Sequence, residues 1–100
     1  MSTIMVRYKV KPERAEENEQ LVRAVYEELE RTAPAGLRYA TFKLDDRVSF
    51  VHIAARETED GQNPLLAVRA FQAFQKDVAD RCAEPPEARE LHEVGSFRFR

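Results

Sequence analysis

The stretch "LRYATFKLDDRVSFVHIAA", residues 37–55, decides the fold more directly than any other part of the chain. Residues 37–44 and 48–55 are rich in the β-branched and aromatic side chains that favour β-strands. The letters between them, "DDR", are turn formers, and a three-residue connection of this kind closes an antiparallel hairpin. The middle of the chain is therefore expected to form two paired strands.

On the C-terminal side of this hairpin we expect a helix and then a strand. Asn63 followed by Pro64 has the pattern of a helix N-cap with proline at the first helical position. Apolar residues at helical spacing predict one helix that runs to about residue 82. These residues are Ala67, Phe71, Phe74, Val78 and Cys82. "AEPPEA", residues 83–88, is expected to break the helix before a last strand over 90–99.

On the N-terminal side of the hairpin we expect a strand and then a helix. Residues 3–10 alternate apolar and polar side chains, which predicts a strand. Pro12 suits the start of a helix, and residues 13–32 carry one apolar stripe. Its members are Leu21, Val22, Val25, Tyr26 and Leu29.

The predicted order is β-α-β-β-α-β in a single domain over residues 1–100. This is the ferredoxin-like order of an α+β fold, with a four-stranded antiparallel sheet and two helices on one face. A chain of 100 residues is large enough for one modest core.

Composition argues against several classes of partner. The net charge is −2 with no basic block, which disfavours nucleic acid and anionic membranes as the main partner. No apolar run is long enough to suggest a membrane span. The N-terminal stretch has no targeting pattern, and Cys82 has no second cysteine to pair with. We expect a cytoplasmic protein.

Two helices cover one face of the sheet, so the other face is expected to be polar. Alternation predicts one apolar face made of Ile4, Val6, Tyr8, Ala40, Phe42, Leu44, Val51 and Ile53. It predicts a second, mixed face made of Met5, Leu37, Tyr39, Val48, Phe50 and Ala54 with Arg7, Lys9, Thr41, Lys43 and His52. Because this second face is too apolar for open water, we expect a homodimer that packs sheet face against sheet face.

The element order, the length, and the stretches "AFQAFQKDVADR" (70–81) and "LHEVGSFRF" (91–99) resemble the antibiotic biosynthesis monooxygenase family. This family is a branch of the dimeric α+β barrel superfamily. The resemblance implies a barrel formed by two sheets across a dimer, and a cavity between the sheet and the helices of each subunit.

The resemblance also implies two kinds of chemistry. One is cofactor-independent oxygenation of quinols or phenols, which needs an apolar pocket, a base and donors for an oxyanion. The other is haem degradation, which the chain does not fit because it has no tryptophan and no histidine on the second helix. The predicted function is therefore a cofactor-independent monooxygenase that acts on a small aromatic, phenolic or quinol compound.

The residues expected to carry this reaction lie mostly on the strands. His52 would act as the base, because its ordinary pKa suits proton transfer near neutral pH. Tyr39 and Arg7 would be the orienting donors, and alternation places both on the face of His52. The expected pocket wall is Phe50, Phe71 and Phe74.

An alternative stays open at this point, namely a non-catalytic ligand-binding or structural homodimer. Related quinol enzymes carry histidines near the second helix and a glutamate with a tryptophan on the third strand. Where those enzymes carry the histidines, this chain has Phe71 and Phe74. Where they carry the glutamate and the tryptophan, it has Ala54 and Arg56. His52 could equally be a structural histidine.

Two further site classes find little support in the sequence. Two histidines and one cysteine without ligand spacing predict no metal site. The RNA recognition motif shares this strand order, but the chain lacks the glycines, neighbouring aromatics and positive charge that motif requires.

Overall fold

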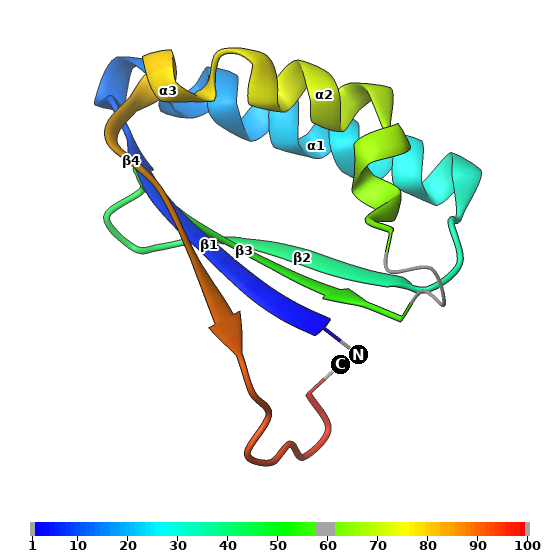
Figure 1. The fold of residues 1–100 in the computed structure, drawn as a ribbon. Helices are drawn as coiled ribbons and strands as arrows, with labels where there is room; N and C mark the ends of the chain where they lie inside the picture. The colour runs from blue at the N-terminus through cyan, green and yellow to red at the C-terminus, as the bar shows by residue number, and fades with distance from the viewer. Residues whose placement is uncertain (1, 58–61, 100) are drawn as a thin grey trace.

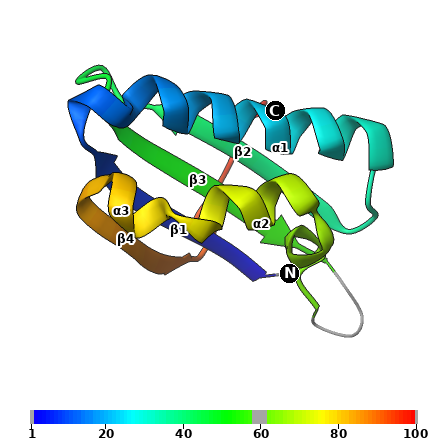
Figure 2. The same ribbon diagram turned by 90° about the horizontal axis from the view of Figure 1, so that it is seen from above.

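The computed structural model describes residues 2–57 and 62–99 and has the β-α-β-β-α-β order (Figure 1). The strands are β1 (Ser2–Val10), β2 (Leu37–Lys43), β3 (Ser49–Arg56) and β4 (Cys82–Leu91). The helices are α1 (Ala15–Thr32), α2 (Arg69–Lys76) and α3 (Val78–Arg81), with 3-10 turns η1 (Pro12–Arg14) and η2 (Pro64–Ala67). The strands form one antiparallel sheet in the order β2-β3-β1-β4. All helices lie on one face of this sheet (Figures 1 and 2).

The long helix α1 begins and ends close to the predicted residues. Pro12 opens the 3-10 turn that leads into it, and Val22 and Val25 are buried against the sheet. It ends at Thr32 and is capped by the next residue, Ala33, whose φ of 43° is left-handed and whose N–H donates to the carbonyl of Leu29. No described helix combines the length and the apolar character needed to cross a bilayer.

The second helical segment is broken, whereas the sequence predicts one continuous helix over residues 64–82. Val68 is extended and separates η2 from α2, and Asp77 interrupts the segment again before α3. The start of α2 is capped from outside, because the Glu28 carboxylate of α1 accepts from the N–H groups of Arg69 and Ala70. Figure 2 shows α2 lying beside α1, which makes this contact possible.

The last strand occupies other residues than predicted. β4 spans Cys82–Leu91 and pairs with β1, so the stretch over 83–88 that was expected to break the helix is itself part of a strand. Pro85 and Pro86 are tolerated there because β4 is at the edge of the sheet and its register shifts at this point. Most of the predicted strand over 90–99 has irregular structure, and Cys82 begins β4 instead of ending a helix.

The predicted composition of the two sheet faces is wrong. Side chains alternate within each strand as predicted, but the set from β1 faces the opposite side relative to β2 and β3. In β1 and β3, Val6 lies opposite His52 and Tyr8 opposite Phe50, so these four side chains share the face that the helices cover. Thr41 of β2 also lies opposite His52. The outer face instead carries Met5, Arg7, Lys9, Ala40, Phe42, Val51 and Ile53. As a result, His52 lies under the helices, and Arg7 lies on the outer face.

Candidate functional site

A cavity of about 390 Å³ lies between the helix-covered face of the sheet and α2. Its walls are mainly apolar and aromatic, and they come from all four strands and from the segment around α2. Aromatic and histidine rings in this wall include Tyr8, Tyr39, His52, Phe71 and Phe74. The ring of His52 lies 5.3 Å from that of Phe74, centroid to centroid, which places the imidazole directly against α2.

His52 is held by hydrogen bonds at both ring nitrogens. Its Nε2 lies 2.8 Å from the Tyr8 hydroxyl, and its Nδ1 lies 2.6 Å from the Tyr39 hydroxyl. Thr41 Oγ1 is a second neighbour of Nδ1, at 3.2 Å. The side chain is only 6% exposed, because β1 and β2 flank it on both sides. The imidazole is therefore fixed in orientation before any ligand enters.

Burial keeps these three rings uncharged at neutral pH. It lowers the pKa of His52 to about 4, because the charged imidazolium would lose its hydration. Burial also raises the pKa values of Tyr8 and Tyr39 above their usual range, so both keep their hydroxyl hydrogen. The cavity thus offers neutral hydrogen-bonding groups rather than a charged acid or base at its centre.

The network continues behind Tyr8 through two buried polar residues that the sequence did not single out. Asn18 of α1 is 0% exposed, and its amide nitrogen donates to the Tyr8 hydroxyl over 2.9 Å. Arg81 is 1% exposed, and its Nε donates to Asn18 Oδ1 over 3.1 Å. Its Nη2 donates to the carbonyl of Phe74 over 2.7 Å, and its guanidinium lies over the Phe74 ring. One signal was present, because Asn18, Val22 and Val25 have the 4 and 3 spacing of a buried stripe.

The predicted site residues divide into two groups. Tyr39 and His52 are in contact, and Phe71 and Phe74 lie in the cavity wall. Phe50 does not border this cavity; it is buried beside it, stacked on Tyr8 with 5.6 Å between the ring centroids. The expectation that Arg7 shares a face with His52 is wrong, because Arg7 lies opposite Val51 and is exposed on the outer face.

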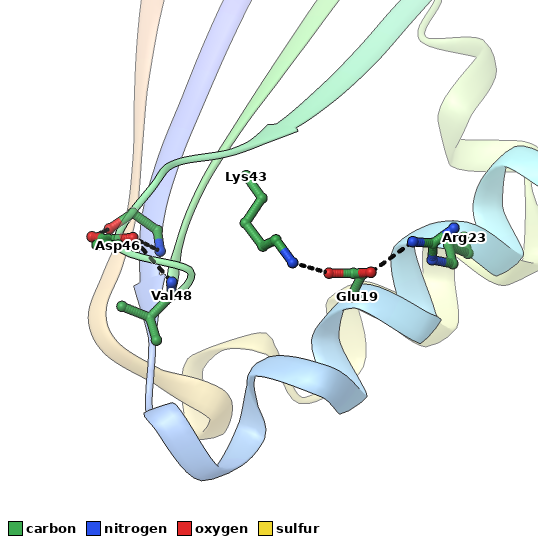
Figure 3. A network of polar contacts seen from close by, with 6 residues as sticks. Glu19, Arg23, Lys43, Asp46 and Val48 are labelled. Carbon is green, nitrogen blue, oxygen red and sulfur yellow. Dashed lines mark hydrogen bonds and ion pairs between the residues drawn. The ribbon is translucent and has the colours of Figure 1, made fainter.

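Lys43, another basic residue predicted on the face of His52, is engaged elsewhere. Its Nζ donates to Glu19 Oε1 over 2.6 Å, and Glu19 Oε2 accepts from Arg23 over 2.7 Å (Figure 3). This ion pair joins the end of β2 to α1. The adjoining turn is held by Asp46, whose carboxylate accepts from the N–H groups of Val48 and Ser49. These charges stabilise the fold and do not border the cavity.

Three other polar residues border the cavity, namely Arg56 at the end of β3, Asn63 before η2 and Gln75 of α2. In the described part of the chain, no carboxylate forms an ion pair with Arg56, so its guanidinium can meet an anionic group of a ligand. Among the described residues, no three histidine, cysteine or carboxylate side chains lie close enough together to hold a metal ion.

Comparison with protein-family models and with curated proteins finds no match. Solved structures do match. A candidate antibiotic biosynthesis monooxygenase from Nitrosomonas europaea is 20% identical, with a TM-score of 0.76 over 95% of this chain and 100% of that one. Another candidate, from Bacteroides thetaiotaomicron, is 17% identical, with a TM-score of 0.77 over 93% of this chain and 89% of that one.

A third structure with the same fold is a variant of SnoaB, a cofactor-independent oxygenase from Streptomyces nogalater. It is 18% identical, with a TM-score of 0.69 over 97% of this chain and 96% of that one. At these identities the likeness concerns the fold alone. The chain therefore has the ferredoxin-like fold of the antibiotic biosynthesis monooxygenases.

Proposed function

We propose that the cavity beside His52 binds a small aromatic, phenolic or quinol compound. The observation that carries this proposal is an aromatic cavity of about 390 Å³ with one hydrogen-bonded Tyr39–His52 pair in its wall. Binding sites for small molecules are typically apolar hollows of this size with a few well-placed polar groups. Phe71 and Phe74 suit the ring of the ligand, and Tyr39 suits its oxygen.

We further propose cofactor-independent monooxygenation as the reaction, in line with the fold shared with the SnoaB oxygenase. A phenol and O₂ would give a quinone and water. One oxygen atom enters the ring, the other leaves as water with the two displaced hydrogens, and O₂ takes up the electrons that the ring loses. Such a reaction begins from the phenolate, which is far more electron-rich than the phenol.

The chain would favour the phenolate by binding it, because His52 is a weak base. With a pKa of about 4, His52 is poorly matched to take a proton from a phenol. The Arg56 guanidinium and the Tyr39 hydroxyl can instead stabilise an oxygen that is already ionised. This assigns the sequence-predicted base, His52, the task of orienting Tyr39.

A second candidate is a ligand-binding or structural protein without catalysis. It is favoured by the engagement of both His52 nitrogens and by the low pKa of this residue. In this case the compound would bind in the same cavity and leave unchanged.

For either function we propose a homodimer that packs through the outer sheet face. That face carries large apolar side chains, and the exposed Val94, Phe97 and Phe99 follow β4 beside it. A groove there is bordered by Phe42 and Ile53 of the sheet and by Phe99. A second copy would remove this apolar surface from water.

Binding and turnover can be measured separately. Calorimetric titration with a panel of phenols and quinols tests binding, and oxygen uptake with product detection tests turnover. The parent is compared with Tyr39→Phe, which keeps the ring and removes the hydroxyl, and with Arg31→Gln as a control at an exposed residue away from the cavity and the outer-face groove. We expect Tyr39→Phe to lose most of the turnover and Arg31→Gln to lose none.

Binding without oxygen uptake by the parent would support the second candidate over the first. Absence of binding across the whole panel would refute the proposed ligand class.

A further inference from the structure

A continuous chain of hydrogen bonds, three of them buried and the last one half-buried, connects α3 to the cavity. It runs from a guanidinium through an amide, a phenol and an imidazole to a second phenol. In order, these groups belong to Arg81, Asn18, Tyr8, His52 and Tyr39. Each lies on a different element, namely α3, α1, β1, β3 and β2. The cavity groups are thus linked to a residue that does not touch the cavity.

The first member of the chain determines the direction of the first three hydrogen bonds. A guanidinium can only donate, so the atom of Asn18 that faces Arg81 must be the amide oxygen. The amide NH₂ then faces Tyr8 and donates to its oxygen. Because the Tyr8 oxygen accepts from Asn18, the Tyr8 hydrogen is free to be donated to Nε2 of His52 over 2.8 Å. Nε2 therefore accepts, and the neutral imidazole carries its proton on Nδ1.

The opposite tautomer would leave a buried hydrogen without an acceptor. With the proton on Nε2, both Asn18 and His52 would donate to the Tyr8 oxygen. The Tyr8 hydrogen would then have no acceptor in any contact that the described residues make to this hydroxyl. The free-energy cost of such an unsatisfied buried group corresponds to a population ratio of about 5- to 150-fold in favour of the Nδ1–H tautomer over the Nε2–H tautomer.

The tautomer in turn sets what Tyr39 can do. The Nδ1–H group donates to the Tyr39 oxygen over 2.6 Å, with Thr41 Oγ1 as a weaker second acceptor at 3.2 Å. The Tyr39 hydrogen then points away from His52. Tyr39 is half-buried and borders the cavity, so this hydrogen is available to an acceptor oxygen of a ligand there.

We propose that Arg81 and Asn18 are positioning residues that fix the Nδ1–H tautomer of His52 and so make Tyr39 a hydrogen-bond donor toward the cavity. The site then selects ligands that present an acceptor oxygen, such as a carbonyl or a phenolate, over ligands that present only a donor. The selection of ligands rests on the proposed function, whereas the tautomer does not.

The tautomer can be observed directly in the free protein. A long-range ¹H–¹⁵N correlation spectrum separates protonated from unprotonated imidazole nitrogens, because the two kinds resonate in different ranges. The His92→Gln variant removes the other histidine, so the remaining signals belong to His52. We expect the unprotonated nitrogen to be the one coupled to both ring carbon-bound hydrogens, which is Nε2. A protonated Nε2 at neutral pH would overturn the proposal.

Asn18→Asp tests whether the relay sets the tautomer. The new carboxylate has almost the same shape and can pair with Arg81, which favours correct folding. It has no hydrogen to donate, so Tyr8 must donate to it and then accept from Nε2–H. We expect the spectrum to reverse to the Nε2–H tautomer. An unchanged Nδ1–H pattern in a folded variant would show that the relay does not control His52.

Ligand selection is tested with two bicyclic probes of similar size. 1-Indanone offers an acceptor oxygen and no donor, whereas indole offers an N–H donor and no comparable acceptor. We expect the parent to bind 1-indanone about 3- to 10-fold more tightly, as one hydrogen bond allows, and Asn18→Asp to lose this preference. Equal binding of both probes by the parent would refute the selection. If neither binds, the proposed ligand class fails, while the spectrum still decides the tautomer.

Discussion

The low pKa of His52 predicts that the protein loses stability on mild acidification. The folded state holds the imidazole neutral down to a pKa of about 4, whereas the unfolded chain has the ordinary value of 6.5. The unfolded state therefore binds more protons between these two values. The contribution of His52 to the free energy of unfolding is constant above pH 6.5 and falls as the pH drops toward 4.

The structure also gives the size of this effect. A pKa difference of this extent corresponds to about 3 kcal/mol, at about 1.4 kcal/mol per unit. Little discount for solvent screening applies, because His52 is only 6% exposed. A loss of about 3 kcal/mol is a large share of the stability of a domain of this length, which is typically about 5–15 kcal/mol.

Urea denaturation at fixed protein concentration between pH 7 and pH 4 measures this loss. His52→Gln removes the titrating group, so the stability difference between it and the parent isolates His52 from the carboxylates. Arg31→Gln is the control, because it changes an exposed side chain at the end of α1, away from both the cavity and the outer-face groove, and should follow the parent. A stability difference between the parent and His52→Gln that stays constant from pH 7 to pH 4 would refute the reasoning.

Two further predictions concern the surface. The hydrogen bond from Lys43 lowers the pKa of Glu19 to about 2, so this ion pair stabilises the fold above pH 4.5 and is lost as the pH falls through 2. Because Glu19 is 30% and Lys43 40% exposed, Glu19→Gln should cost less than about 1 kcal/mol in urea denaturation. Salt at about 1 M should abolish the difference between this variant and the parent. Sedimentation equilibrium at micromolar concentration should give twice the 11.6 kDa chain mass, and Phe42→Glu should give the single mass. A parent of 11.6 kDa would contradict the dimer.

The element order could be predicted because each of its signals is local. The hairpin follows from residues 37–55, and the start of α1 follows from Pro12. The faces of the sheet could not be predicted in the same way. Alternation fixes which side chains of one strand share a face. It does not fix how β1 is phased against β3, whose paired residues lie 40 (Lys9 and Ser49) to 54 (Ser2 and Arg56) positions away. That phase decides that Tyr8, and not Arg7, accompanies His52.

The predicted boundaries of α2 and β4 are wrong for a related reason. The cap of α2 is a carboxylate on α1, 41 residues before Arg69, so no signal next to α2 announces where that helix begins. Two adjacent prolines favour a break in most settings, and only the edge position of β4 makes them acceptable in a strand.

The site was predictable in part. Tyr39 and His52 lie on neighbouring strands of one hairpin, where alternation and a short turn bring them together. The Asn18–Arg81 contact joins residues 63 positions apart. A buried arginine that has no carboxylate partner among the described residues also runs against composition rules, which place this residue at the surface. Only the packing of α3 onto α1 reveals it.

The prolines of β4 also limit how this protein can associate with other chains. An edge strand normally presents free N–H groups to which a foreign strand can add, and this is a common route to aggregation. Pro85 and Pro86 have no N–H, and the flanking Glu84 and Glu87 add negative charge at the same place. A strand approaching this border of the sheet would find few donors and a repulsive field. Growth of the sheet past β4 is therefore disfavoured by the chemistry of four consecutive residues.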